Sequence, residues 1–214
     1  MSHILPQHSH PQPLYCAQQV KTGEVEAAKL AGLEMYQLML SAGEAVFNHV
    51  VGQYGCDIKL LVLCGGGNNG GDGYVVAKLA MQKGIKVTLW SVVSPDKLIG
   101  DAKRAYQDYV LAGGQFEQIK PDQIEYFDVV VDALLGTGLN GPVRGDVEVL
   151  IQQVNNAHIA TVSVDVPSGL CSDSGRALGC CIKATHTVTF IGIKQGLVTG
   201  QARACVGELH FSGL

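Results

Sequence analysis

An apolar run that breaks abruptly into glycines constrains this chain more than any other stretch. Residues 60–63 are all aliphatic, which is typical of a strand buried on both faces of a sheet. Residues 65–73 follow with the sequence GGGNNGGDG, and a helical spacing of apolar residues continues from Tyr74. In a strand, glycine loop and helix of this order, the free N–H groups of the helix favour a phosphate or pyrophosphate at the loop. We therefore expect an anion-binding turn here.

The loop differs from the dinucleotide fingerprint of ordinary dehydrogenases. It contains G-x-G-x-x-G, but the second strand, at residues 86–93, ends in Ser94 and Pro95 and not in the acid that binds a ribose. A conventional dehydrogenase is therefore disfavoured. Two asparagines and an aspartate in the loop indicate a site that binds polar groups or a cation as well as phosphate. The structural alternative is a tight β–α turn with Asn and Asp as turn formers.

Composition excludes several classes of protein. Of the 214 residues, 47% are apolar and 16% are charged, which fits one α/β domain with a core and not a disordered chain. The net charge of −4 argues against a nucleic-acid binder. We find no membrane-spanning run and no secretory signal, so we expect a cytoplasmic protein. The seven cysteines form no C-x-x-C motif and predict reduced thiols, not a disulfide framework.

The remaining patterns alternate between strands and helices, which predicts a mostly parallel sheet covered on both faces. One or two helical turns are expected at residues 121–126. Residues 1–14 are expected to be irregular, and His3, His8 and His10 could bind a metal only loosely. We expect helices at residues 17–31, 35–54, 74–83, 95–111 and 147–157, and strands at 60–63, 86–93, 115–119, 128–135, 159–166, 185–193 and 208–211.

Three predicted strands end in polar loops, at residues 68–72, 132–142 and 165–168. The carboxyl ends of parallel strands lie along one edge of a sheet, so these loops should line one cleft. Asp132 and Asp165 each lie near the end of an apolar strand, where a carboxylate needs backbone N–H donors or a cation. Each could serve as a general acid or base, or as a structural acid that caps a neighbouring loop.

Other catalytic motifs are missing from the sequence. No G-x-S-x-G and no Ser-His-Asp order supports acyl transfer, and no G-x-x-x-x-G-K-[ST] supports a P-loop nucleotidase. Ser168 has no histidine close in sequence, which favours a hydroxyl ligand or a helix cap over a nucleophile.

Three segments, GGGNNGGDGY, VVDALLGTGL and SVDVPSGL, closely resemble the YjeF N-terminal domain family in order and spacing. The segments AGLEMYQLMLSAG and THTVTFIGIKQGLVTG also resemble it, so the similarity spans residues 15–212. The family comprises the NAD(P)H-hydrate epimerases. The resemblance implies a Rossmann-like three-layer α/β/α sandwich over residues 15–214. It also implies an isomerase that interconverts the R and S epimers of hydrated NADH and NADPH, in nicotinamide nucleotide repair, with a bound potassium ion.

The resemblance also assigns roles to single residues. Asp165 would be the acid/base residue. Asn69, Asp132 and Ser168 would contribute oxygens to the potassium site, and oxygen is the ligand that a hard cation prefers. The residues that would bind the hydrated dinucleotide are Asn68, Asn69, Gly70, Gly71, Asp72, Gly136, Thr137, Gly138, Leu139, Asn140, Gly141, Pro142 and Asp165.

The resemblance leaves the partners of the domain open. The domain is expected to be the N-terminal half of a bifunctional epimerase and dehydratase, or to act with a separate ADP- or ATP-dependent NAD(P)H-hydrate dehydratase. A homodimer is a further option. Nucleic-acid and membrane partners are not expected. The alternative is a non-catalytic nucleotide-binding or dimerising scaffold, because a eukaryotic mRNA-decapping enhancer contains a similar domain. Asp132 and Asp165 argue against it, since a scaffold needs neither.

Overall fold

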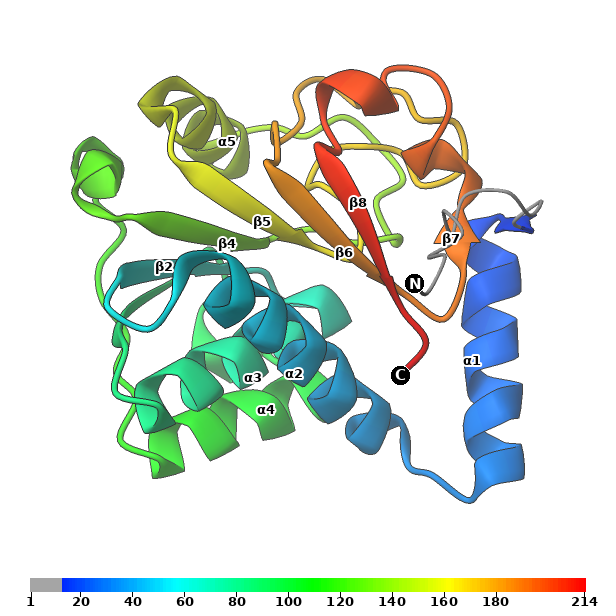
Figure 1. Cartoon of the computed structure of the whole chain (residues 1–214), viewed down its shortest axis with the longest axis horizontal. Coiled ribbons are helices and arrows are strands. Elements are labelled where there is room, and N and C mark those ends of the chain that lie inside the picture. The colour runs from blue at the N-terminus through cyan, green and yellow to red at the C-terminus, as the bar shows by residue number, and fades with distance from the viewer. Residues whose placement is uncertain (1–12) are drawn as a thin grey trace, which may run out of the picture.

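The computed structural model describes residues 13–214 and contains a six-stranded sheet in which every neighbouring pair is parallel (Figure 1). This confirms the predicted α/β fold. Two short strands, β1 (Leu14–Tyr15) and β7 (Ile193–Lys194), form a separate parallel pair. The strand order in the main sheet is β3 (Lys86–Ser91), β2 (Lys59–Cys64), β4 (Val129–Ala133), β5 (Ala160–Val164), β6 (His186–Phe190) and β8 (Glu208–Ser212).

Helices cover both faces of the sheet (Figure 1). On one face α2 (Met35–Tyr54), α3 (Asn68–Gln82) and α4 (Gly100–Leu111) form one apolar cluster with the side chains of Leu60 and Val62. On the other face α5 (Asp146–Ala157) packs against the alternate β2 residues, Leu61 and Leu63, together with the 3₁₀ turn η2 (Pro121–Tyr126). Successive side chains of a strand point to opposite faces, so the aliphatic run of β2 belongs to both cores.

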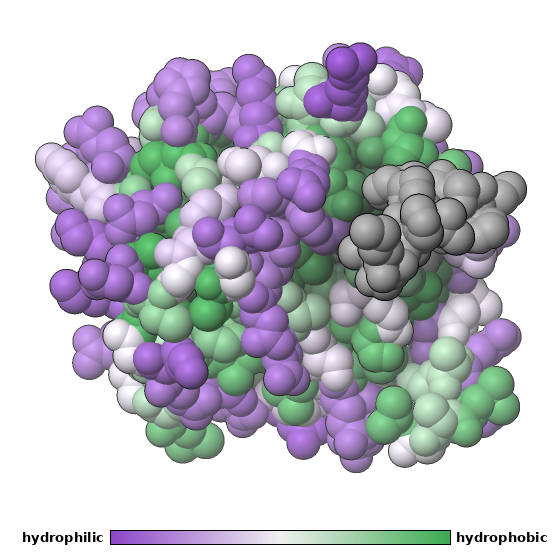
Figure 2. All heavy atoms as spheres, in the orientation of Figure 1, coloured by the Kyte–Doolittle hydropathy of each residue, from purple (hydrophilic) through white to green (hydrophobic). Residues whose placement is uncertain are grey.

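The first helix, α1 (Ala17–Ala31), stands apart from these layers, at the side of the molecule near β7 (Figure 1). On the face seen in Figure 2, hydrophilic residues are interspersed with smaller hydrophobic areas. One of these areas lies over the turn between α1 and α2, where Leu30 and Leu33 are exposed. Among the helices of residues 13–214, none combines the length and the apolar character that a membrane span needs.

The helix after the glycine run begins at Asn68, six residues before the predicted start at Tyr74. The prediction was wrong because glycine has a low intrinsic helix propensity, whereas here its small size is what matters. A Cβ added at Gly71 would lie 2.5 Å from Cε of Met39, and one at Gly73 would lie 2.7 Å from Cβ of Ala133. The glycines therefore let the first turns of α3 approach its neighbours closely.

Other predicted boundaries also need correction. The helix expected at residues 95–111 is divided into the 3₁₀ turn η1 (Pro95–Lys97) and α4, because Leu98 and Ile99 between them are extended. Gly100, which begins α4, takes a φ of 57°. Residues 115–119 form no strand, although the N–H of Glu117 donates one hydrogen bond to the carbonyl of Leu89 in β3.

At the N-terminus, the irregular tail predicted at residues 1–14 lies mostly outside the described residues. At its end, Leu14 pairs with Ile193 and so belongs to β1.

The prediction that all cysteines are reduced thiols is wrong for one pair. Cys181 and Cys205, 24 residues apart in sequence, form a disulfide. The bond lies in a small apolar cluster with Leu170, Leu197 and Val206, among the connections that flank β6 and β8. Neither cysteine belongs to a local motif, so only the fold brings the two together.

Candidate functional site

A cavity of about 820 Å³ opens where the connections after β2, β4 and β5 meet. The three polar loops singled out in the sequence all contribute to it, as the shared edge of parallel strands requires. Helix α1 supplies a further wall through Val20, Lys21 and Glu24, whereas the sequence analysis predicted only that a helix forms there. The predicted dinucleotide-binding residues that line the cavity are Asn68, Asn69, Asp72, Gly136, Thr137, Gly138, Leu139, Asn140 and Asp165.

Four predicted binding residues, Gly70, Gly71, Gly141 and Pro142, are not among the lining residues. For Gly70 and Gly71 the structure gives the reason. A Cβ at Gly70 would collide with the backbone of Gly65, and one at Gly71 would meet the side chain of Met39. Both glycines are therefore required for packing of α3, because there is no space for a side chain at either position.

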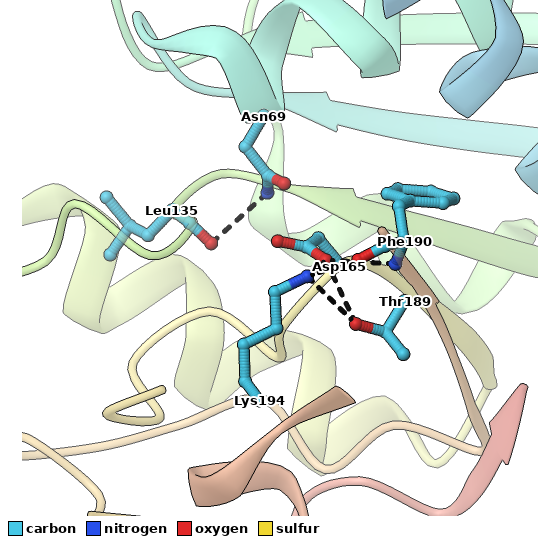
Figure 3. Close-up of polar contacts among 6 residues, drawn as sticks. All are labelled: Asn69, Leu135, Asp165, Thr189, Phe190 and Lys194. Carbon is cyan, nitrogen blue, oxygen red and sulfur yellow. Dashed lines mark hydrogen bonds and ion pairs between the residues drawn. The ribbon is translucent and has the colours of Figure 1, made fainter. Parts of the chain in front are cut away.

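Asp165 follows β5 directly and takes a left-handed backbone conformation, with φ of 63°. Such a conformation costs a non-glycine residue on the order of 1 kcal/mol and is often found at functional sites. Oδ1 of Asp165 accepts hydrogen bonds from Oγ1 of Thr189 at 3.0 Å and from the N–H of Phe190 at 3.3 Å (Figure 3). It also accepts one from Nζ of Lys194. Three donors thus hold one carboxylate oxygen and leave Oδ2 without a partner among residues 13–214.

Lys194 is the main site residue that the sequence analysis missed. It is 1% exposed, and its ammonium donates to Asp165, to Oγ1 of Thr189 at 3.1 Å and to the carbonyl of Phe190 at 2.9 Å (Figure 3). Lysine is almost never fully buried unless it is paired. A lysine inside the apolar segment FIGIKQGL was therefore a usable signal, and the sequence analysis did not use it.

Further carboxyl groups face the same cavity, among them Asp72 of α3 and Glu24 of α1. Burial raises the pKa of Asp72 well above 3.8, and the charges of Asp165 and Glu24 raise it further, while Lys194 opposes them. Burial and then Asp165 also raise the pKa of Glu24. Glu24, Asp72 and Asp165 therefore interact electrostatically with one another and with the buried Lys194, and burial shifts Asp72 towards its protonated form.

Two of the three predicted potassium ligands, Asn69 and Ser168, lie around the backbone N–H and carbonyl of Leu135. Nδ2 of Asn69 donates to the carbonyl of Leu135 at 3.1 Å (Figure 3). The N–H of Leu135 donates to Oγ of Ser168 at 2.8 Å, and that hydroxyl also lies 3.2 Å from the Leu135 carbonyl. Amide, hydroxyl and carbonyl oxygens form a donor set that suits a hard cation. A half-turn of the Asn69 amide would present Oδ1 in place of Nδ2, so these residues fit potassium.

Asp132 is fully buried and does not line the cavity. Its carboxylate accepts hydrogen bonds from Oγ of Ser163 at 2.8 Å, from the N–H of Ser168 at 2.9 Å and from the N–H of Leu134 at 3.3 Å. The hydroxyl of Ser168 donates as well. Burial raises the pKa of Asp132, and these hydrogen bonds lower it. Asp132 therefore links the loop after β4 to the loop after β5 by hydrogen bonds, and it holds Ser168 of the candidate cation site in place.

Comparison with protein families matches residues 35–196 to the YjeF-related protein N-terminus. The chain belongs to this family. The matched range contains Asp132, Asp165 and Lys194, while Glu24 of α1 lies before it. The YjeF N-terminal fold is also similar to the crystal structure of the yeast protein ynu0, with a TM-score of 0.76 and 22% identity over 87% of this chain and 83% of the yeast chain.

Two bacterial relatives of this YjeF-family chain share the name bifunctional NAD(P)H-hydrate repair enzyme Nnr. The protein from Vibrio cholerae is 50% identical over 214 residues, which are 100% of this chain and 43% of the relative. The protein from Escherichia coli K12 is 45% identical over 206 residues, which are 96% of this chain and 40% of the relative. The chain therefore spans about two-fifths of the length of these relatives.

Proposed function

We propose that residues 15–214 form a single NAD(P)H-hydrate epimerase domain, an isomerase that interconverts the R and S epimers of hydrated NADH and NADPH. The observation that carries the proposal is the carboxylate of Asp165, fixed through Oδ1 by three donors and unpartnered at Oδ2 in a cavity of about 820 Å³. Membership of the YjeF N-terminal family and the names of the bacterial relatives support the same reaction.

The cavity suits a nucleotide in size and polarity. Pockets for small molecules and cofactors commonly measure about 300–1,000 Å³, so the volume accommodates a large part of a dinucleotide. Gly66, Gly67 and Asn68, at the N-terminus of the 15-residue helix α3, line it. Free N–H groups at the start of such a helix stabilise a phosphate group, which gives the pyrophosphate of the substrate a place in the cavity.

Epimerisation needs the hydroxyl-bearing carbon to lose and regain its configuration, by C–O cleavage or by ring opening. We favour ring opening, because it begins with removal of the hydroxyl proton, and the Asp165 carboxylate, paired with Lys194, is placed to accept that proton. The Asp165 carboxylate accepts the hydroxyl proton while the carbon–nitrogen bond breaks and the carbon becomes a carbonyl. The ring nitrogen receives a proton at the same time, and ring closure on the other face reverses both transfers. Asp72, whose pKa is raised by burial, is the acid suited to supply that second proton.

Potassium is proposed to bind the oxygens of Asn69, Ser168 and Leu135, supported by the buried charge of Asp132. When bound, the ion supplies positive charge at the edge of the cavity, where it favours an anionic ligand. A dehydratase partner, fused or separate, is proposed from the length and the bifunctional names of the relatives. The homodimer and the cytoplasmic location stay predictions from the sequence.

The direct test is to incubate the protein with one purified epimer of hydrated NADPH and to follow formation of the other by chromatography. The proposal expects interconversion well above the spontaneous rate, in the presence of potassium. A dimerising scaffold would leave the spontaneous rate unchanged, and that result would overturn the proposal.

A further inference from the structure

Three histidines from different elements meet on the sheet surface beneath α2, and none of them lines the cavity. His49 belongs to α2, His186 begins β6 and His210 lies in β8. One ring nitrogen of each residue lies within 4.8 Å of the other two. In the register of β6 and β8, His186 lies opposite Glu208. His210 is two residues after Glu208, so the side chains of His186, Glu208 and His210 all lie on the face of the sheet that α2 covers.

The geometry of this histidine cluster resembles a metal site. Nδ1 of His186 and Nε2 of His210 are 3.2 Å apart. In a tetrahedral zinc site, Zn–N distances of about 2.0–2.1 Å put neighbouring ligand nitrogens about 3.3 Å apart. The carboxylate of Glu208 lies 3.7 Å from the same nitrogen of His186 and 3.6 Å from the same nitrogen of His210. Glu208 thus faces both nitrogens and is placed to be the fourth ligand.

The histidine cluster contains a buried nitrogen atom that lacks a hydrogen-bond partner. Nε2 of His49 is buried and has no hydrogen-bond partner among residues 13–214. An unpartnered buried donor or acceptor costs about 1–3 kcal/mol, so a native protein usually gives such an atom a partner or a ligand. The ring of His49 lies 4.9 Å from that of His186 and 4.2 Å from that of His210, measured between centroids. The buried atom therefore belongs to the cluster itself.

We propose that His49, His186 and His210, with Glu208 as fourth ligand, bind a divalent transition-metal ion of the zinc class. Imidazole nitrogens suit zinc, copper and nickel, whereas the oxygens around Leu135 suit potassium, so the two sites select different ions. The ligands come from α2 and from two strands, one of which, β8, is the edge strand of the sheet. The bound ion therefore cross-links α2 to the edge of the sheet, and its role is to stabilise the fold.

The test begins from a background in which His3, His8 and His10 are replaced by Gln, so that the N-terminal histidines contribute no zinc binding. Zinc is titrated against a chromophoric chelator, and the melting temperature is measured with and without the ion. We expect one zinc ion per chain and a higher melting temperature when it is bound. His49→Gln and His210→Gln should each weaken binding at least about tenfold, because each removes one of four ligands.

The matched control is His158→Asn, since His158 is exposed at the end of α5 and its left-handed backbone tolerates asparagine. It should bind zinc as the background does. Equal binding in the background, His49→Gln and His210→Gln proteins would overturn the proposal. Cobalt(II) binding to the unaltered chain gives a check that needs no variant. A tetrahedral spectrum without thiolate charge transfer is expected, and a thiolate band would assign the ion to the free cysteines and contradict the proposal.

Discussion

The ammonium of Lys194 donates to Oδ1 of Asp165 and, through the same nitrogen, to Thr189 and Phe190. The lysine side chain is 2% exposed and that of the aspartate 18%. The pair thus fixes one carboxylate oxygen and leaves the other for a ligand. Because the ammonium is buried and the carboxylate is mostly buried, each charge is stabilised by the other in the folded state.

Replacing Lys194 with Met should therefore destabilise the fold, because it leaves the Asp165 carboxylate without its cation. Removing one partner of a buried pair costs about 3 kcal/mol. The Lys194→Met/Asp165→Asn double variant should lose less than the sum of the single losses, by about 0.5–3 kcal/mol. Urea unfolding of all four proteins measures this. Strict additivity would mean that the two side chains do not interact.

A methyl group at Gly70 should damage the fold and not merely the ligand site. It would collide with the backbone of Gly65, and overpacking of this kind costs about 1–3 kcal/mol. Gly67→Ala is the matched control, since Gly67 precedes the same helix and a Cβ there meets nothing within 4 Å. Chemical denaturation should separate the two variants. Equal stability of both would show that Gly70 is not a packing residue.

Asp72 should make stability depend on pH. Its pKa is raised in the folded state, so folding favours the protonated form. The contribution is fully present below the unfolded-state pKa, about 4, and is lost as the pH rises through the raised folded-state value. Asn mimics the protonated acid and does not ionise, so Asp72→Asn should lose less stability than the wild type as the pH rises above about 4. The same pH dependence of unfolding in Asp72→Asn and in the wild type would contradict this. Asp57→Asn, on the exposed surface, is the control.

Asp132→Asn should reduce stability and potassium binding together. The amide would turn an N–H group toward the donors of Ser163, Ser168 and Leu134, and a lost acceptor at a buried site costs about 1–3 kcal/mol. Calorimetric titration with potassium, beside a thermal melt, measures both effects. A variant with the wild-type melting temperature would contradict the role of Asp132 as the buried junction of two loops.

The sequence was a good guide to the fold because aliphatic runs such as those of β2 and β4 are typical of buried parallel strands. It was also a good guide to the location of the cavity, since Asp165, directly after β5, and the glycine loop after β4 both line it. The sequence was misleading at the start of α3, where glycines allow close packing. The low helix propensity of glycine predicts a loop there, whereas the packing of α3 requires these small residues within the helix.

Contacts that depend on the whole fold had no local signal. Glu24 lies in a helix with no motif, and it reaches the cavity only because α1 stands beside the main body of the domain. The disulfide between Cys181 and Cys205 and the cluster of His49, His186 and His210 join residues far apart in the chain. No spacing rule links such residues before the strands are placed.

The rate of epimerisation by Asp165→Asn, at saturating hydrated NADPH, tests the central claim most directly. Asn keeps the size of the side chain and an acceptor for Lys194 but cannot accept and return a proton. The variant should remain folded in a thermal melt and bind the dinucleotide, while turnover falls by a factor of about 100 to 10,000. Asp57→Asn, at an exposed site outside the cavity, should keep the wild-type rate. A folded Asp165→Asn enzyme that interconverts the epimers at the wild-type rate would contradict the account.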